Sequence, residues 1–289
     1  HPHNVGDFFY THYMLKPVPI VIDGNLQLNA ISAAILGTMK PEDIIFNSKN
    51  PNEMFRGRGM VVKTFINAIF STIKAVDKKK YNPTHVCIVW DRKLKGKYSK
   101  TLILDKLKDG TTYKSDRTFV TEDDLKNPDL TPKEKREIEA KLLVSKEFLA
   151  ARSFIQDKLP KYGIPSFSLP GWEADDIDYI WGLETNKRGG LHIHCSGDSD
   201  WQFHLTNNDI HWQLVRGKLY LRTVKSVIEK NKIPKKMGLM EWASINYSAL
   251  GSHNNLLRTV DPSIKRFTKK YRDKLFSGDT SVIGNMPRY

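Results

Sequence analysis

Short apolar runs that each end in an acidic residue are the feature that most limits how this chain can fold. Residues 18–22 are apolar and mostly β-branched and lead into Asp23, and residues 85–90 lead into Asp91 in the same way. Runs of this length are typical of strands buried on both faces of a parallel sheet. Because Asp23 precedes a glycine, we expect a turn at the end of the first strand.

Helices are predicted between these strands. Residues 60–76 carry apolar side chains at every fourth position, which marks one helical face. Thr131 begins a capping box with proline at the first helical position, and the helix that it opens should run towards Leu159. Further short strands are predicted at 164–169 and 191–195. Strands alternating with helices indicate an α/β fold with a central, mostly parallel sheet flanked by helices.

Length and composition narrow the class of protein. A chain of 289 residues with 39 % hydrophobic residues can build a core, so a mainly disordered chain is excluded. We expect no membrane contact, since we find no apolar run of the ~18 residues that a span needs. Two cysteines, Cys87 and Cys195, are too few for a disulfide framework and fall in predicted strands. With no signal segment evident, we expect a cytoplasmic protein, in the host cell if phage-encoded.

The positive charge is concentrated in two places. The formal net charge is +14, and residues 92–117 and 258–289 contribute +6 and +5 of it. Either run alone is as readily a solvated face as a binding surface. Two runs on either side of a nearly balanced remainder favour contact with a phosphate backbone, and hence a nucleic-acid partner.

Carboxylates cluster after four of the predicted strands. In open α/β sheets, ligands bind beyond the carboxyl ends of the strands, so these acids are expected to converge there. One such acid alone could be a helix cap or a turn residue, but several like charges in one place require cations, and oxygen ligands favour Mg²⁺ or Mn²⁺. His192 and His194 lack zinc-site spacing and are interpreted as structural. The candidate ligands are Asp23, Asp91, Glu173, Asp175, Asp176, Asp198 and Asp200.

A cluster of carboxylates that binds metal in a basic protein indicates phosphodiester hydrolysis. Two cations ~3.5–4 Å apart can activate a water and stabilise the leaving oxygen of an in-line displacement. The basic stretches would then hold the nucleic acid.

Five motifs in this order resemble the flap endonuclease / 5′–3′ exonuclease family, with the greatest likeness to bacteriophage members, including the phage ribonuclease H type. The likeness extends over residues 19–275. The motifs are Val-Ile-Asp-Gly-Asn at 21–25, Trp-Asp at 90–91, Tyr-Lys-Ser-Asp-Arg at 113–117, Gly-Trp-Glu-Ala-Asp-Asp at 171–176 and Ser-Gly-Asp-Ser-Asp at 196–200.

The resemblance implies a PIN-like (5′ nuclease) fold with residues 1–289 as a single 5′-nuclease domain. Within it, 92–130 would form an arch-type insertion and 241–289 a helical, helix–turn–helix-like element that binds duplex. The implied activity is metal-dependent cleavage of flaps, 5′ ends or RNA primers in DNA replication or processing. Its partners would be branched or 5′-ended duplex DNA or an RNA–DNA hybrid, and replication proteins such as a single-strand binding protein or clamp.

The resemblance also implies roles for single residues. Asp23, Asp91, Glu173 and Asp175 would hold a first ion with Asp176 close by, and Asp198 and Asp200 a second. Lys114 and Arg117 would stabilise charge on the scissile phosphate, and Tyr113 would either stack on a base or pack internally. Arg56, Arg58 and Lys63 would contact phosphates at the cleft or remain solvated. Lys265, Arg266, Lys269 and Lys270 would hold the phosphates of the downstream duplex.

One motif departs from the family pattern. Where family members carry two further acids, this chain has Ser252, His253, Asn254 and Asn255. Neutral oxygens bind Mg²⁺ more weakly than carboxylates, so a weakened second site is expected. Three functions therefore remain open: an active 5′ nuclease, a nuclease-derived protein that binds branched DNA without cutting it, and a PIN-type enzyme that cuts RNA.

Overall fold

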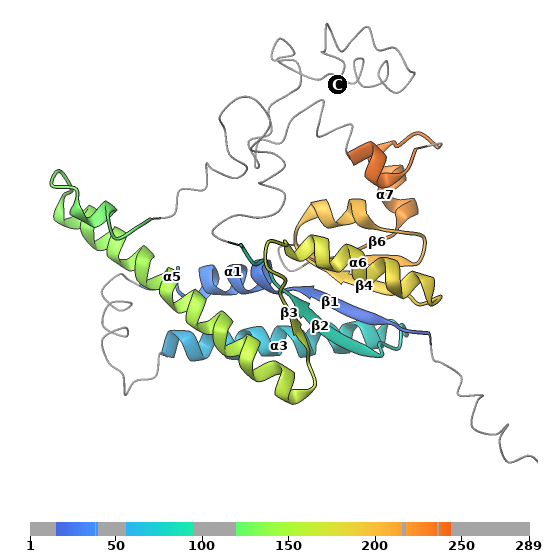
Figure 1. Ribbon diagram of the computed structural model, residues 1–289, viewed down its shortest axis with the longest axis horizontal. Coiled ribbons are helices and arrows are strands. Elements are labelled where there is room, and N and C mark those ends of the chain that lie inside the picture. The colour runs from blue at the N-terminus through green and yellow to red at the C-terminus, as the bar shows by residue number, and fades with distance from the viewer. Residues whose placement is uncertain are drawn as a thin grey trace, which may run out of the picture.

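A computed structural model describes residues 16–37, 39, 56–94, 120–215, 218–235 and 237–243. Its centre is a six-stranded sheet with the order β3-β2-β1-β4-β5-β6 (Figure 1). The first five strands along the chain are parallel, and β6 pairs antiparallel with β5. The predicted α/β architecture is therefore confirmed. The strands are β1 (Pro19–Asp23), β2 (His85–Val89), β3 (Ser166–Phe167), β4 (His192–Cys195), β5 (Asp209–Val215) and β6 (Lys218–Arg222).

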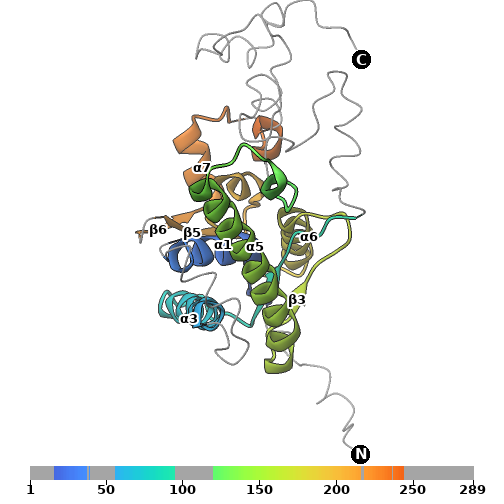
Figure 2. The same ribbon diagram turned by 90° about the vertical axis from the view of Figure 1, so that its left-hand side faces the viewer.

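Three helices cover one face of the sheet: α1 (Gly24–Ile35), α3 (Arg56–Lys78) and α5 (Pro132–Lys158). Alternate residues of β1 and β2 point to this face, among them Ile20, Ile22 and Ile88, and form the main core with the helices. Figure 2 shows α1 and α3 on one side of the sheet and α6 (Ala174–Lys187) on the other.

Helix α3 contributes its predicted stripe to this core. Val61, Phe65 and Ile69 are each at most 1 % exposed. The segment Gly57–Lys78 is also long and apolar enough to cross a membrane by length and composition alone, which the expectation from the sequence missed. In this fold its stripe packs against the sheet, and core helices of soluble proteins pass the same test.

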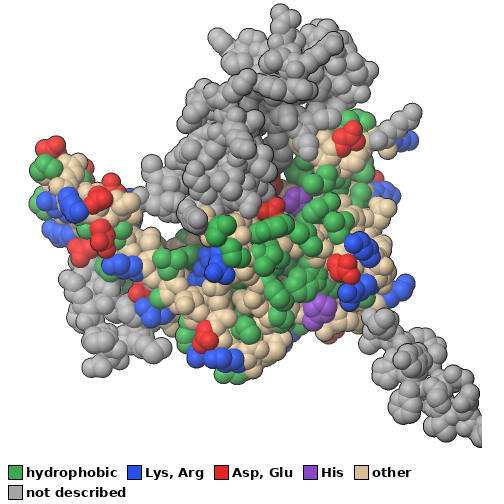
Figure 3. Space-filling view, in the orientation of Figure 1, with side chains coloured by type: hydrophobic (Ala, Val, Ile, Leu, Met, Phe, Trp, Pro, Cys, Tyr) green, Lys and Arg blue, Asp and Glu red, His purple; other side chains and the backbone are tan. Residues whose placement is uncertain are grey.

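Helix α6 covers the opposite face, where Val21, Cys87 and Val89 form a small apolar cluster with its first turns. Both cysteines are buried and free, as expected from their positions in predicted strands. Further along, β4 and β5 present buried polar side chains to α6 instead of apolar ones. The outer surface of α6 carries exposed Ile180 and Leu183, and Figure 3 shows apolar surface over this part of the molecule.

A third apolar cluster lies beyond β6. It joins the short 3₁₀ helix η4 (Ser199–His204) to α7 (Val224–Asn231) and to a helical segment at 239–243, through Phe203, Val227 and Trp242. The segment that follows β4 is thereby anchored at its far end by packing.

Helix α5 begins as the sequence predicts. Thr131 is the N-cap, and its side chain and that of Glu134 form the reciprocal capping box. Its N-terminal half extends beyond the sheet (Figure 1) and is preceded by the single 3₁₀ turn η2 (Asp124–Lys126). At the other end, η3 (Leu159–Tyr162) leads into Gly163, whose φ of 79° permits the turn towards β3.

The turn predicted after the first strand is wrong. Asp23 ends β1 and is at once the N-cap of α1, so the strand passes directly into the helix. Gly24 makes this junction possible, because a Cβ there would lie 2.7 Å from Ile88 Cγ2 and from the Trp90 ring. Most of the proposed arch-type insertion (95–119) and nearly all of the proposed duplex-binding element (244–289) lie outside the described residues.

Candidate metal centre

Five of the seven predicted acids line one cavity of about 160 Å³ at the carboxyl ends of β1, β2 and β4. They come from four segments of the chain that are distant in sequence. This is the edge where ligands bind in open α/β sheets, as expected. The five are Asp23, Asp91, Glu173, Asp175 and Asp198.

Asp23 occupies the floor of this cavity and is 7 % exposed. Its Oδ1 accepts a hydrogen bond from Leu26 N (3.0 Å), and its Oδ2 accepts one from Ser196 Oγ (3.0 Å). Burial raises its pKa to about 7, and the charges of Asp91 and Asp198 raise it too, against the effect of the two hydrogen bonds. Three carboxylates thus repel one another here, a condition that a bound cation would relieve.

Asp91 follows β2, and its side chain is hydrogen-bonded to the start of α6. Its Oδ1 accepts a hydrogen bond from Ala174 N at 2.7 Å, in the first turn of that helix. Its backbone carbonyl accepts another from Arg152 Nη2 at 2.5 Å, and the Arg152 guanidinium lies 5.3 Å from the centre of the Trp90 ring. A long helix on one face and the N-terminus of α6 on the other therefore fix the position of this acid.

Glu173 is the N-cap of α6 and is 4 % exposed. It forms a capping box with Asp176, whose Oδ2 accepts a hydrogen bond from Glu173 N at 3.1 Å. Carboxylate oxygens of Glu173, Asp175 and Asp176 lie within 4.8 Å of one another. The helix N-terminus favours this concentration of negative charge through its dipole.

Asp198 reaches the cavity from the segment after β4. It is the N-cap of η4, and its Oδ1 accepts a hydrogen bond from Asp200 N at 3.0 Å. Its own backbone N donates to Ser196 Oγ at 3.0 Å. Because the same Ser196 hydroxyl donates to Asp23, one side chain connects the acid at the end of β1 with the acid in the segment after β4.

Two of the predicted ligands do not line the cavity. Asp176 holds the first turn of α6 through its capping bond, close to the cavity as the resemblance implies. Asp200 follows Asp198 by two residues and lies in the first turn of η4.

Two lining residues escaped sequence reasoning. Asn25 and Asn29 lie on the first turns of α1 and line the same cavity. The Asn25 Oδ1 atom is buried and has no hydrogen-bond partner among the residues that the structure describes. Asn25 follows Asp23 by two positions, and this closeness to a predicted ligand was a signal in the sequence. It was missed because the turn predicted after Asp23 placed Asn25 outside a helix.

The basic residues predicted to contact nucleic acid lie in different surroundings, and most of them lie outside the described residues. Arg58 pairs with Glu147 of α5 through two hydrogen bonds, Nε–Oε2 at 2.8 Å and Nη2–Oε1 at 3.1 Å. Lys63 is exposed and lines a groove of about 310 Å³ between α3 and α5. The side chain of Arg56 is not described. Outside the described residues lie Tyr113, Lys114, Arg117, Ser252, His253, Asn254, Asn255, Lys265, Arg266, Lys269 and Lys270.

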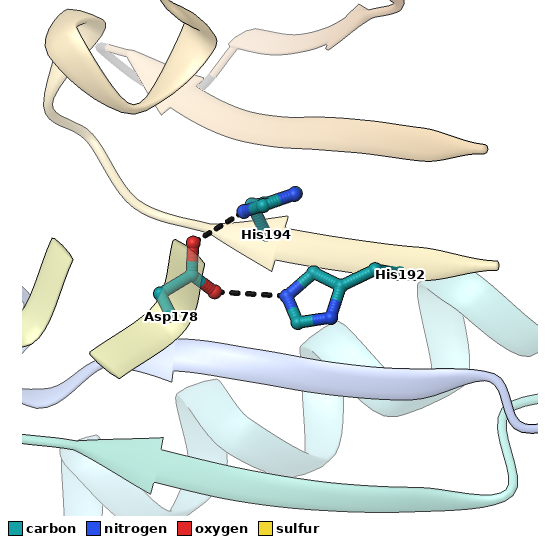
Figure 4. A group of neighbouring side chains, drawn as sticks. All are labelled: Asp178, His192 and His194. Carbon is teal, nitrogen blue, oxygen red and sulfur yellow. Dashed lines mark hydrogen bonds and ion pairs between the residues drawn. The ribbon is translucent and has the colours of Figure 1, made fainter. Parts of the chain in front are cut away.

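The two strand histidines belong to a buried ionic cluster (Figure 4). Asp178 of α6 bridges them: its Oδ1 lies 2.9 Å from His192 Nε2, and its Oδ2 is hydrogen-bonded to His194 Nδ1. The other ring nitrogen of His194 faces Asp209 at 3.5 Å. Aspartate and histidine are residue types that bind metals. Here, however, the carboxylate oxygens of Asp178 and the ring nitrogens that face them are hydrogen-bonded to one another, which fits a structural role for both histidines.

Charge pairing decides the protonation of this cluster. Burial alone would lower the pKa of His194, but Asp178 and Asp209 outweigh it and raise that pKa to about 9. The pKa of His192 is lowered by burial and by the charge on His194. Burial would raise the pKa of Asp178, but the two imidazoles hold it well below its usual range. At neutral pH the cluster is therefore one imidazolium between two carboxylates, beside a neutral imidazole.

The strand order, the flanking helices and the acids at the strand ends define the PIN-like α/β fold of 5′ nucleases. No family model and no curated protein matches the sequence. Solved structures that share the fold include several from bacteriophage T5. The resemblance seen in the motifs is thereby confirmed as a likeness of fold.

Three T5 structures illustrate the likeness. The T5 protein co-crystallised with metal ions aligns with a TM-score of 0.57 at 15 % identity, over 92 % of this chain and 77 % of that one. The T5 flap endonuclease in a pseudo-enzyme–product complex with DNA and metal ions gives 0.54 at 17 % identity, over 94 % and 80 %. The zinc-bound T5 5′-exonuclease gives 0.54 at 18 % identity, over 92 % and 86 %.

Proposed function

We propose that this chain is a metal-dependent 5′ nuclease, a 5′–3′ exonuclease or flap endonuclease that hydrolyses phosphodiester bonds of branched or 5′-ended DNA. The observation that carries the proposal is the convergence of five carboxylates, from four distant segments, on one cavity at the strand ends. The formal charge of +14 on the same chain supports a polyanionic substrate. The T5 protein of the same fold, solved with DNA and metal ions, supports the same substrate class.

The cavity fits divalent cations. Its polar lining consists of carboxylate and amide side chains, which are the oxygen ligands that Mg²⁺ and Mn²⁺ prefer. The buried, unpartnered Oδ1 of Asn25 is a further neutral oxygen suited to a cation or to a water bound to it. When bound, two such ions supply an activated water and stabilise the leaving oxygen.

The proposed roles of single residues are those that the family resemblance implies. Asp23, Asp91, Glu173 and Asp175 would hold the first ion, and Asp198 with Asp200 the second. Asp176 would keep the start of α6 in place through its capping bond. Lys114 and Arg117 would stabilise charge on the scissile phosphate. Lys265, Arg266, Lys269 and Lys270 would hold the duplex, as the sequence predicts.

The alternative is a protein that binds branched DNA without cutting it. It depends on the neutral residues Ser252, His253, Asn254 and Asn255, which lie outside the described residues. The five acids gathered in the cavity favour the active enzyme, because a binding protein has no use for a cluster of mutually repelling carboxylates. An RNA-primer substrate and the replication partners stay predictions.

The proposal is tested by cleavage of a labelled 5′-flap DNA with Mg²⁺ or Mn²⁺. Asp91→Asn and Asp198→Asn should each slow cleavage by about 100-fold or more, since each removes a charged ligand worth several kcal/mol of transition-state stabilisation. Binding of the flap should persist, and the control Asp157→Asn, on the exposed surface of α5, should cut like the wild type.

Wild-type protein that binds the flap but leaves it intact would establish the binding alternative. A parallel substrate with an RNA primer in place of the DNA flap tests the narrower prediction of primer removal.

A further inference from the structure

The segment that carries Asp198 leaves the sheet where its backbone pairing stops. The last residues in register between β4 and β5 are Cys195 and Trp212, and Ser196 and Gly197 follow without a strand partner. Ser196 is buried, so its carbonyl oxygen needs another donor, because a buried carbonyl without a hydrogen bond is costly.

Two side chains of β5 supply these donors. His211 Nε2 lies 3.0 Å from Ser196 O, and Gln213 Nε2 donates to Gly197 O at 3.0 Å. They are two positions apart on the strand, so their side chains point to the same face of the sheet, which is the face that α6 covers. His211 is fully buried and Gln213 is 4 % exposed. Gln213 is itself oriented by Arg222 of β6, whose Nε donates to Gln213 Oε1 at 3.1 Å.

The bond to Ser196 O fixes the form of the His211 ring. A carbonyl only accepts, so Nε2 must carry the proton, and Nδ1 is buried without a partner within the described part of the chain. Burial lowers the pKa of His211 to about 4, so the ring is neutral at physiological pH. It therefore acts as a fixed donor and brings no extra charge to the cavity.

The segment held in this way is the one that joins two acids of the cavity. Ser196 Oγ donates to Asp23 Oδ2 and accepts from Asp198 N, both at 3.0 Å. A displacement of the Ser196 or Gly197 backbone would move that hydroxyl and the Asp198 side chain together.

We propose that His211 and Gln213 are positioning residues of the metal cavity, which hold the Ser196–Gly197 backbone so that Asp198 and Asp23 keep their places in the lining of that cavity. Neither side chain lines the cavity, so neither touches the ion or the substrate. The inference rests on the proposed function in that it takes the cavity to be a metal site.

The test measures Mn²⁺ binding to the full-length, metal-free protein by titration calorimetry, without DNA. His211→Leu and Gln213→Met each remove a donor at similar volume and should weaken Mn²⁺ binding by about 10-fold, the lower end of what loss of a supporting hydrogen bond costs a metal site. His211→Gln keeps a side-chain N–H donor and should recover most of the affinity. Circular dichroism and thermal melts verify that each variant is folded.

Asn186→Leu is the matched control. Asn186 donates to Asp209 at 2.9 Å in the same α6–β5 interface, but its hydrogen bonds go to Thr206 and Asp209 and not to the Ser196–Gly197 backbone, so its loss should lower stability and leave Mn²⁺ affinity unchanged. The inference is overturned if His211→Leu and Gln213→Met fold and bind Mn²⁺ like the wild type. Equal weakening by Asn186→Leu, or no recovery in His211→Gln, would overturn it too.

Cleavage of the 5′-flap DNA in the same samples separates this inference from the proposed function. If the wild type binds Mn²⁺ and the variants weaken it but no form cuts, the nuclease proposal fails and the positioning role stands. If the wild type cuts and the variants bind Mn²⁺ normally, the positioning role fails and the nuclease proposal stands. A wild type that binds no Mn²⁺ overturns the positioning role.

Discussion

At the scale of single residues, the buried ionic cluster beneath α6 makes stability depend on pH. His194 lies between Asp178 and Asp209, with the neutral ring of His192 beside it. Since its pKa rises from 6.5 to about 9 on folding, its contribution to stability is complete below pH 6.5 and is lost as the pH passes 9.

We therefore expect the free energy of unfolding to fall between pH 6.5 and pH 9, by ~1–3 kcal/mol. His194→Gln lacks a titrating ring there, so the difference between wild type and variant should shrink as the pH rises. Urea unfolding at several pH values measures this. A constant difference from pH 6 to pH 9.5 would show that His194 is not charged in the fold.

Single residues also show how much of the candidate site could be predicted from the sequence. Acids placed directly after strands were predictable, because parallel strands end at one edge of the sheet, and five of the seven line the cavity. Asp176 and Asp200 have the right residue type, but the local bonds they make can be read only from the structure. The roles of His211 and Gln213 depend on where the β4–β5 pairing stops, which no local pattern encodes.

At the scale of elements, the pair Arg58–Glu147 joins α3 to α5. Glu147 is 7 % exposed and accepts two hydrogen bonds from the guanidinium, in the geometry typical of strong Arg–carboxylate pairs. The sequence predicted a phosphate contact or a solvated surface for Arg58, and it missed this partner because the two residues are far apart along the chain.

Glu147→Ala should destabilise the protein by ~1.5–3 kcal/mol, because it removes charged hydrogen bonds and leaves the part-buried guanidinium without this carboxylate. Asp157→Ala is the control on the same helix. Asp157 pairs with Lys158 and Lys161 at the surface, where water screens the charges, so its loss should change stability much less. Chemical denaturation distinguishes the two, and equal effects would contradict a structural role for the buried pair.

Helices and strands that have a strong local sequence pattern could be predicted, and those that lack such a pattern could not. The capping box at Thr131 and the four-residue stripe of α3 located two long helices. Helix α1 was missed because Asp-Gly is a frequent turn sequence, whereas here the glycine lets the helix start against Trp90. No prediction was made for β5. A buried strand is recognised in a sequence by a run of apolar residues, but several of the buried side chains of β5, which face α6, are polar.

At the scale of the whole molecule, charge should govern DNA binding. If Lys265, Arg266, Lys269 and Lys270 each neutralise a phosphate, the logarithm of affinity should fall with the logarithm of salt concentration with a slope of about −4 or steeper. Substituting all four by alanine should reduce the slope by about 3–4, while Mn²⁺ binding stays unchanged. Fluorescence anisotropy at 50–300 mM salt tests this, and an unchanged slope would place the duplex contacts elsewhere.

The spacing of the acids along the chain has a consequence for synthesis. The cavity needs residues from Asp23 to Asp198, and β4, which carries the last of them, inserts beside β1 at the centre of the sheet. A growing chain therefore has no complete cavity until residues beyond 198 have left the ribosome. Incomplete chains released before that point would lack the cavity, so premature termination yields fragments without the proposed metal site.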